Sequence, residues 1–265
     1  MKVFVSLLLI IVLLSSVKET TAQQKHSSIY LTARPDSVLF DAASTAILVI
    51  DMQNDFGAKG GMFDRAGIDI SGIQKVVDPI TSVLTAARKR GIQIIYLKMA
   101  FKPDLSDLGS TEFPTRMKRA KKLHIGDTMV APDGTMGRIL VQNTWNTEIL
   151  PGLKPQSKDI IISKNRFNGF YQTTLDSVLR SLGKKYLILV GCTTSICVES
   201  TARDAYFRGF MPVVLGDCTA EPIGNTLART NHEASLLVIQ TSFGLVSSSQ
   251  EFIKSIAQPA KVGVK

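Results

Sequence analysis

Histidine is scarce and scattered in this 265-residue chain. The three that occur are His26, His124 and His232. Their spacing offers no ligand set for zinc or iron, and the cysteines form no zinc-binding pattern that would replace it. We therefore expect a protein that works without a metal or any other cofactor.

Cysteine is equally scarce, with three residues in the chain: Cys192, Cys197 and Cys218. An odd count leaves at least one thiol without a disulfide partner. We interpret Cys192 and Cys218 as apolar filler at the ends of strands. A bridge between Cys192 and Cys197 is not expected in the active protein, because Cys197 has the setting of a reactive thiol.

Long apolar runs are missing after the first 22 residues, so no later segment is predicted to span a bilayer. Near its start the chain has a lysine, continues with an apolar run at 4–17 and then has the small residues Thr-Thr-Ala at 20–22. This order is typical of a secretory signal peptide, which we predict at residues 1–22. The protein would then be secreted or lie in the secretory lumen, with no membrane contact after cleavage. An uncleaved signal anchor is the alternative.

The 22 acidic residues are outnumbered by 31 lysines and arginines, which gives a formal net charge of +9. The basic residues are spread along the chain apart from a cluster at 116–122, and no aromatic residues alternate with them. We therefore expect no nucleic-acid partner, although the charge could steer anionic small molecules. With 45% hydrophobic residues and no repeat or low-complexity tract, the chain is predicted to form one domain at 31–256.

Short β-branched runs alternate with segments of helical periodicity through most of the chain. This alternation predicts a three-layer α/β/α fold, Rossmann-like, with a mostly parallel six-stranded sheet. The predicted strands are 46–50, 92–97, 159–162, 186–190, 211–215 and 236–239. The predicted helices are 73–90, 175–182, 198–208 and 224–234. Residues 99–155 break the pattern and contain the single tryptophan, Trp145; we interpret them as a lid or subunit contact over the site, with a mobile surface loop as the alternative.

Three chemically active side chains follow predicted strands. Asp51 comes directly after 46–50, Lys164 follows 159–162, and Cys197 opens the helix after 186–190. The carboxyl ends of parallel strands gather the chemistry of open α/β sheets, and a helix start favours a thiolate. Taken one at a time, Asp51 could cap a helix, Lys164 could be a surface lysine and Cys197 could fill the core.

Together with their surroundings, these residues resemble the Asp–Lys–Cys triad of the isochorismatase-like cysteine hydrolases. The similarity rests on Ile-Asp-Met-Gln-Asn-Asp-Phe at 50–56, on Lys164, and on Gly-Cys-Thr-Thr-Ser-Ile-Cys-Val-Glu-Ser-Thr-Ala-Arg-Asp-Ala at 191–205. Segments 31–35, 165–180 and 197–204 are similar to ureidoacrylate amidohydrolases, and segments 60–64, 102–108 and 137–140 to biuret hydrolases.

The resemblance implies that Asp51 is the general base, that Lys164 lowers the pKa of the thiol, and that Cys197 is the nucleophile. It also implies an oxyanion hole formed by the backbone N–H groups of Thr193 and Cys197, next to a cis peptide bond between Cys192 and Thr193. We interpret Phe56 and Phe167 as walls for a small planar substrate, with simple core residues as the alternative, and we count Phe101 as a further substrate-binding candidate. Gln240 is expected to contact a substrate carbonyl, as a glutamine near this position does in the biuret branch.

The implied activity is a cysteine amidohydrolase that cleaves a C–N bond of a small linear amide or ureido compound through a thioester and releases ammonia. Family members are often oligomers, so a homodimer or homotetramer is expected. Two alternatives stay open: a hydrolase of a cyclic or aromatic amide, which a wide apolar pocket around Phe101 and Trp145 would favour, and a secreted binding protein without activity.

Overall fold

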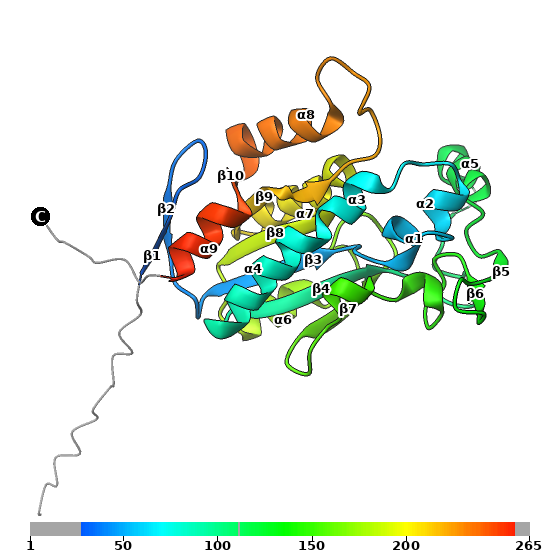
Figure 1. Ribbon diagram of the computed structural model, residues 1–265, viewed down its shortest axis with the longest axis horizontal. Helices are drawn as coiled ribbons and strands as arrows, with labels where there is room; N and C mark the ends of the chain where they lie inside the picture. The colour runs from blue at the N-terminus through cyan, green and yellow to red at the C-terminus, as the bar shows by residue number, and fades with distance from the viewer. Residues whose placement is uncertain (1–27, 111, 258–265) are drawn as a thin grey trace, which may run out of the picture.

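The computed structural model describes residues 28–110 and 112–257. Its centre is a six-stranded sheet in which every neighbouring pair of strands is parallel, so the predicted sheet is confirmed (Figure 1). In spatial order its strands are β10 (Leu245–Ser247), β9 (Met211–Ala220), β8 (Tyr186–Cys192), β3 (Thr45–Ile50), β4 (Gln93–Met99) and β7 (Ile160–Lys164). The predicted signal peptide at 1–22 lies outside the described residues.

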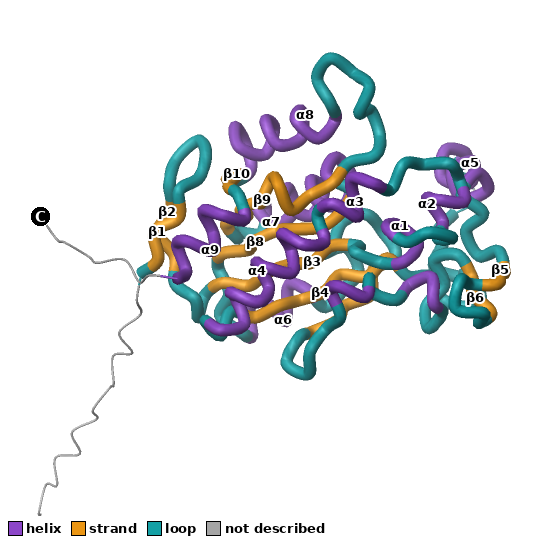
Figure 2. The backbone as a smooth tube through the Cα atoms, in the orientation of Figure 1, coloured by secondary structure: helices purple, strands orange, loops and turns teal. Residues whose placement is uncertain are grey.

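Helices cover both faces of the sheet, which confirms the three-layer arrangement (Figure 2). One face packs against α4 (Val77–Lys89) and α9 (Ser249–Ala257), and the other against α6 (Leu175–Ser181) and α7 (Glu199–Phe207). The strand β3 is buried along its whole length because successive side chains enter opposite cores.

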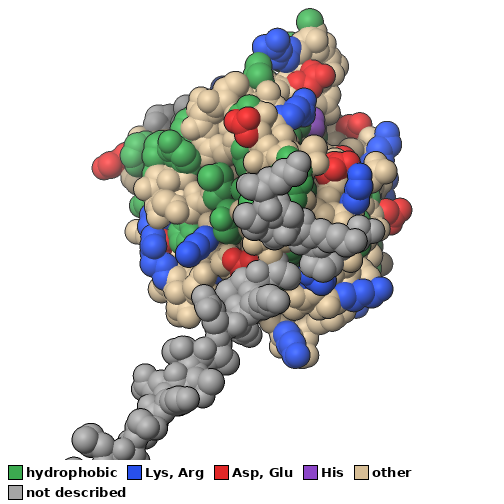
Figure 3. All heavy atoms as spheres, turned by 90° about the vertical axis from the view of Figure 1, so that its left-hand side faces the viewer, with side chains coloured by type: hydrophobic (Ala, Val, Ile, Leu, Met, Phe, Trp, Pro, Cys, Tyr) green, Lys and Arg blue, Asp and Glu red, His purple; other side chains and the backbone are tan. Residues whose placement is uncertain are grey.

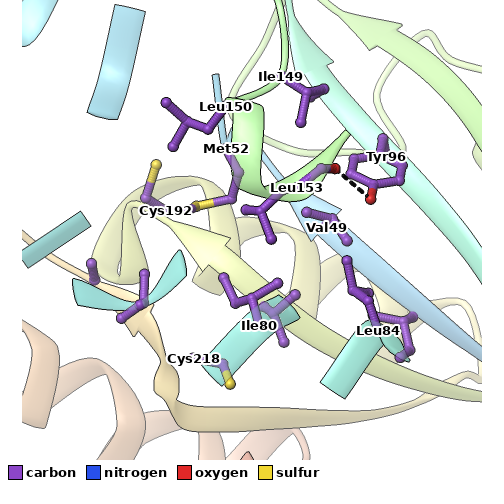
Figure 4. Packing of buried hydrophobic residues seen from close by; sticks show 14 of the residues in the cluster. Val49, Met52, Ile80, Leu84, Tyr96, Ile149, Leu150, Leu153, Cys192 and Cys218 are labelled. Atoms are coloured by element: carbon purple, nitrogen blue, oxygen red, sulfur yellow. Dashed lines mark hydrogen bonds between the residues drawn. The ribbon is translucent and has the colours of Figure 1, made fainter. Parts of the chain in front are cut away.

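The core beneath α4 shows how this packing works (Figure 4). Val49 of β3 and Tyr96 of β4 lie against Ile80 and Leu84 of α4. The Tyr96 hydroxyl donates a hydrogen bond to the Leu153 carbonyl at 2.8 Å, which satisfies the one polar atom of a buried ring. Each of these aliphatic side chains contributes about 1.5–3 kcal/mol by leaving water.

The remaining elements surround this frame. They are β1 (Ile29–Leu31), β2 (Val38–Phe40), α1 (Asn54–Gly57), α2 (Met62–Arg65), α3 (Ser71–Lys75), α5 (Pro114–Lys122), β5 (Thr128–Val130), β6 (Met136–Arg138), α8 (Asn231–Val238), the 3-10 turns η1 (Trp145–Thr147) and η2 (Pro151–Leu153), and the π-helical turns η3 (Thr194–Val198) and η4 (Ile239–Phe243). The insertion predicted at 99–155 contains α5, β5, β6, η1 and η2, so it is a structured addition between β4 and β7.

The strand order reverses between β3 and β8. From β3 the chain proceeds through β4 to β7 on one side, and from β8 through β9 to β10 on the other. A ligand site forms where the order reverses, at the carboxyl ends of the strands. The two strands approach closely there: a Cβ on Gly191, whose φ is +120°, would stand 2.0 Å from the Ile50 carbonyl oxygen. Only glycine fits that position.

Two predictions near the C-terminus are wrong. Residues 236–239, predicted as the last strand, belong to α8 and η4, and the edge strand is β10 instead. The helix predicted at 224–234 begins only at Asn231, after Thr230 caps it by accepting a hydrogen bond from the Glu233 N–H at 3.2 Å. A run of four apolar residues is as compatible with a buried helix as with a strand.

The surface carries charges of both signs. On the face shown in Figure 3, basic and acidic side chains are interspersed rather than gathered into one field. Within residues 28–110 and 112–257, no helix is both long and apolar enough to cross a membrane.

Candidate active site

Asp51 and Lys164 form a fully buried ion pair at the carboxyl ends of β3 and β7. The Lys164 Nζ donates to Asp51 Oδ2 at 2.7 Å and to the Arg166 carbonyl at 3.2 Å. Burial raises the pKa of the Asp51 carboxyl, although the charge of Lys164 acts against this rise. Burial alone would lower the pKa of Lys164, but the charge and hydrogen bond of Asp51, together with the nearby Cys197 and Cys192, outweigh burial and raise that pKa. The pair therefore consists of a firmly protonated ammonium and a carboxylate that accepts a proton readily.

Cys197 lies beside this pair, in the turn η3 that leads from β8 into α7. Its side chain is buried, and its interaction with Asp51 affects the pKa values of both groups. Burial raises the pKa of the Cys197 thiol, whereas the charge of Lys164 and the Thr193 backbone N–H lower it. The net rise means that the resting thiol is protonated, contrary to the expectation from the helix start alone. The second Asp51 oxygen, Oδ1, is buried and has no hydrogen-bond partner within the described chain, which leaves it free to take that proton.

The turn before Cys197 has the backbone form that the family resemblance implies. The peptide bond between Cys192 and Thr193 is cis. Thr193 and Cys197 both face the same cavity. The Cys192 thiol donates to the Asp51 carbonyl at 3.2 Å, and all three cysteines are free and buried. Cys192 thus supports the backbone of Asp51, while Cys197 alone of the three lines the cavity.

A cavity of about 650 Å³ opens over Cys197. Three predicted substrate-binding residues, Phe56, Phe101 and Phe167, line it. Gln240, predicted from the likeness to the biuret branch, is not among its lining residues; it lies in the helical turn η4. Trp145 does not line the cavity either, so the aromatic wall comes from elsewhere.

The insertion supplies much of the cavity wall. Its residues Leu108, Arg119, Ala120, Leu123 and Ile125 line the cavity, together with others from the sheet edge. The prediction that the insertion covers the site is therefore confirmed. A contact between subunits through the same segment stays a prediction.

Three consecutive buried polar residues after Asp51 fasten the insertion, and the sequence analysis did not single them out. The Gln53 amide donates to the carbonyls of Met99 and Thr147 at 3.0 and 3.1 Å. The Asn54 amide donates to the Trp145 carbonyl at 2.8 Å. The signal that could have identified them is a polar run at 53–55, two residues after the apolar run at 46–50.

Asp55 completes this anchor. Its carboxylate accepts hydrogen bonds from the N–H groups of Met62 and Leu140 at 2.9 and 2.6 Å and from the Asn146 amide at 2.7 Å. Burial raises the pKa of Asp55 to about 6, with the three donors acting in the opposite direction. The carboxylate thus joins α2, the segment just after β6 and the turn η1.

A second cluster supports the nucleophile turn from the far side. The buried Glu221 carboxylate accepts from both the N–H and the hydroxyl of Ser195, at 2.8 and 2.5 Å. The Thr194 hydroxyl lies 3.0 Å from Nδ1 of His232 on α8. Sequence reasoning missed Glu221 because a single acidic residue after a strand is compatible with several structural roles.

The described residues contain no group of three or more His, Cys, Asp or Glu side chains arranged to hold a metal ion. The expectation that the protein uses no metal or other cofactor stays a prediction.

Comparison with known proteins identifies the family of the chain. A family model of the isochorismatase domain matches residues 45–251. The chain belongs to this family. Among its relatives, a ureidoacrylate amidohydrolase RutB of Yersinia enterocolitica is 37% identical over 233 residues, which cover 88% of this chain and 97% of that protein. The RutB of Caulobacter segnis is 38% identical, with coverage of 88% and 94%.

Solved structures show the same isochorismatase fold. A cysteine hydrolase from Pseudomonas syringae pv. phaseolicola aligns with a TM-score of 0.70 and 28% identity, covering 83% of this chain and 96% of the other. An N-carbamoylsarcosine amidase from Thermoplasma acidophilum aligns with a TM-score of 0.57 and 23% identity, covering 78% and 96%, and shows likeness of fold. The family resemblance inferred from the triad motifs is thus confirmed.

Proposed function

We propose that the protein is a cysteine amidohydrolase that cleaves a C–N bond of a small linear ureido or amide compound. The observation that carries the proposal is the buried Asp51–Lys164 pair, 2.7 Å between Oδ2 and Nζ, beside the one thiol that reaches the cavity. The relatives that are named ureidoacrylate amidohydrolases support this substrate class.

The reaction begins with transfer of the Cys197 proton to Asp51. Because burial holds the thiol protonated at rest, a base within reach is required, and the raised pKa of Asp51 suits that task. Lys164 stabilises the thiolate by its charge, since it too is buried and stays protonated.

The thiolate then adds to the carbonyl carbon, and the oxyanion accepts hydrogen bonds from the backbone N–H groups of Thr193 and Cys197. Asp51 returns its proton to the nitrogen of the breaking C–N bond, so an amine or ammonia leaves and a thioester with Cys197 remains. Water, deprotonated by Asp51, hydrolyses the thioester and regenerates the thiol. A carbamate product decomposes to ammonia and carbon dioxide, so ammonia reports the reaction for any ureido substrate.

Ammonia release from ureidoacrylate, biuret and N-carbamoyl amino acids tests the proposal. We expect release from at least one class, and its loss in Cys197→Ala, with Cys218→Ala as the matched control because that buried thiol does not line the cavity. Full activity of Cys197→Ala would refute the mechanism. Rapid binding of these compounds without turnover would favour the binding-protein alternative.

We also propose that residues 1–22 direct the protein into the secretory pathway and that the mature chain forms a homodimer or homotetramer. The basic, apolar and small-residue order of the leader supports export. Expression in a secreting host followed by N-terminal sequencing should yield protein in the medium that begins near residue 23. Light scattering on the same material gives the oligomeric state, and a monomer would contradict that part of the proposal.

A further inference from the structure

The cavity over Cys197 has an uneven charge. Among the residues that the structure describes, its lining includes two arginines, Arg119 and Arg166, and no aspartate or glutamate. The nearest carboxylate of the catalytic group, Asp51, is turned to Lys164 and does not line the cavity. The lining is therefore formally positive, and an anionic ligand group gains from it in a partly enclosed space.

The two arginines differ in how they are held. Arg166 Nη1 donates to the carbonyls of Asp107 and Asn165 at 2.9 and 2.7 Å, so this guanidinium is engaged with the protein. The Arg119 guanidinium lies 4.7 Å over the ring of Phe167 and makes no hydrogen bond or ion pair with any part of the chain that the structure describes. Stacking on a ring fixes the plane of a guanidinium and leaves its N–H donors at the edge available.

The rest of the wall is apolar and the space is large. Aromatic and aliphatic side chains dominate it, among them Phe56, Phe63, Phe101, Phe113, Leu123 and Tyr171. At about 30 Å³ per water in the liquid, a cavity of about 650 Å³ has room for roughly twenty water-sized groups. Biuret or ureidoacrylate would fill a small part of it and leave most of the apolar wall uncovered.

We propose that the preferred substrate carries a carboxylate on an apolar body of aromatic size, and that Arg119 binds this carboxylate while the ureido or amide carbonyl lies at Cys197. The planar fork of a guanidinium matches a carboxylate with two parallel hydrogen bonds. This inference rests on the proposed amidohydrolase function and adds to it a substrate class and a residue that determines specificity.

Two pairs of ureas that differ only in the carboxylate test the inference. They are N-carbamoylphenylalanine with 2-phenylethylurea, and 3-ureidopropanoate with ethylurea. In the unmodified protein, kcat/KM should favour the acid of each pair by about tenfold to hundredfold, as expected for a charge-assisted hydrogen bond, and should favour the phenyl pair over the smaller pair. Arg119→Gln should remove most of the preference for the acid, mainly through KM, and Arg119→Lys should keep part of it.

Lys122→Gln is the matched control, because it removes one positive charge from the exposed side of the same helix α5. It should leave the preference for the acid unchanged. A preference that Arg119→Gln leaves intact, or that Lys122→Gln removes equally, would overturn the inference while the amidohydrolase function stands. Equal rates for the phenyl and smaller pairs would overturn the part that concerns size.

A second measurement does not depend on turnover. Alkylation of Cys197 by iodoacetamide should be slowed by 3-phenylpropanoate far more than by 3-phenylpropanol, and Arg119→Gln should abolish the difference. If no urea is hydrolysed but this protection is seen, the proposed function fails and the carboxylate site stands. If neither compound protects, or both protect equally, the carboxylate site is refuted.

Discussion

Replacing Lys164 by methionine should destabilise the protein strongly at neutral pH and much less in mild acid. Methionine keeps the length of the side chain beside Met99, whose sulfur is 3.9 Å from Lys164 Nζ, but it leaves the Asp51 carboxylate buried without a cation. Breaking a buried ion pair in this way costs about 3–5 kcal/mol.

The cost has an upper limit, because Asp51 can take up a proton instead. Keeping a carboxyl of ordinary pKa 3.9 protonated costs about 1.4 kcal/mol per pH unit above that value, hence about 5 kcal/mol at pH 7.5 and about 2 kcal/mol at pH 5.5. Burial raises the pKa of Asp51 in the folded protein above its value in the unfolded chain. A carboxyl raised in this direction destabilises the fold as the pH rises from the unfolded pKa to the folded pKa. The deficit of Lys164→Met should therefore shrink on acidification.

Urea unfolding of the wild type, Lys164→Met and the double variant Asp51→Asn/Lys164→Met at both pH values checks this reasoning. Asparagine suits position 51 because it tolerates the left-handed backbone of Asp51, whose φ is +53°. The double variant should recover most of the lost stability and should show no dependence of the deficit on pH, yet neither variant should release ammonia. A double variant less stable than Lys164→Met, or a deficit that grows in acid, would refute the buried-pair account.

Two further substitutions test the supports of the site. Glu221→Gln should lower kcat about ten- to hundredfold with little change in KM, because the amide nitrogen of glutamine must face either the Ser195 donors or the Ile223 N–H, which donate to the two different oxygens of Glu221. Glu233→Gln on the surface of α8 is the control, and equal losses of kcat in both variants would contradict the assignment. Gly191→Ala should lower the free energy of unfolding in urea by about 3 kcal/mol or more, because its Cβ would meet the Ile50 carbonyl. Gly67→Ala, also at positive φ but with open space around the Cβ, should lower it by about 1 kcal/mol. Equal losses in the two variants would show that the close contact does not matter.

Much of the fold is readable in the sequence because five of the six strands contain runs of β-branched and leucine residues. Four of these five strands are largely buried, whereas the edge strand β7 exposes Ile161. The sixth, β10, has three residues, pairs with β9 and forms a single bridge from Val246 to Arg34, so its structure depends on distant partners that no local pattern reveals. The later start of α8 was readable: Thr230 and Glu233 have the spacing of a capping box, and the structure forms both of its hydrogen bonds.

The site divides along similar lines. Asp51, Lys164 and Cys197 could be found because each follows a strand and because the surrounding motifs are specific. Glu221 and Arg119 could not be found, since the role of a single charged side chain depends on which distant segment lies opposite it in the fold. Arg119 belongs to the basic cluster at 116–122, which nothing in the sequence connects with the site, yet it lines the cavity.

The arrangement of the insertion has a consequence for how such enzymes diversify. The reacting groups lie at the carboxyl ends of β3 and β7 and in the turn after β8. Much of the surrounding cavity wall belongs to the insertion between β4 and β7, which Gln53, Asn54 and Asp55 hold in place by hydrogen bonds. The residues that carry out the reaction and the residues that select the substrate thus belong largely to different segments of the chain. A different insertion that keeps the hydrogen bonds to these three residues can place a new cavity wall over the same catalytic residues. The substrate preference can then change without any change in the residues that break the bond.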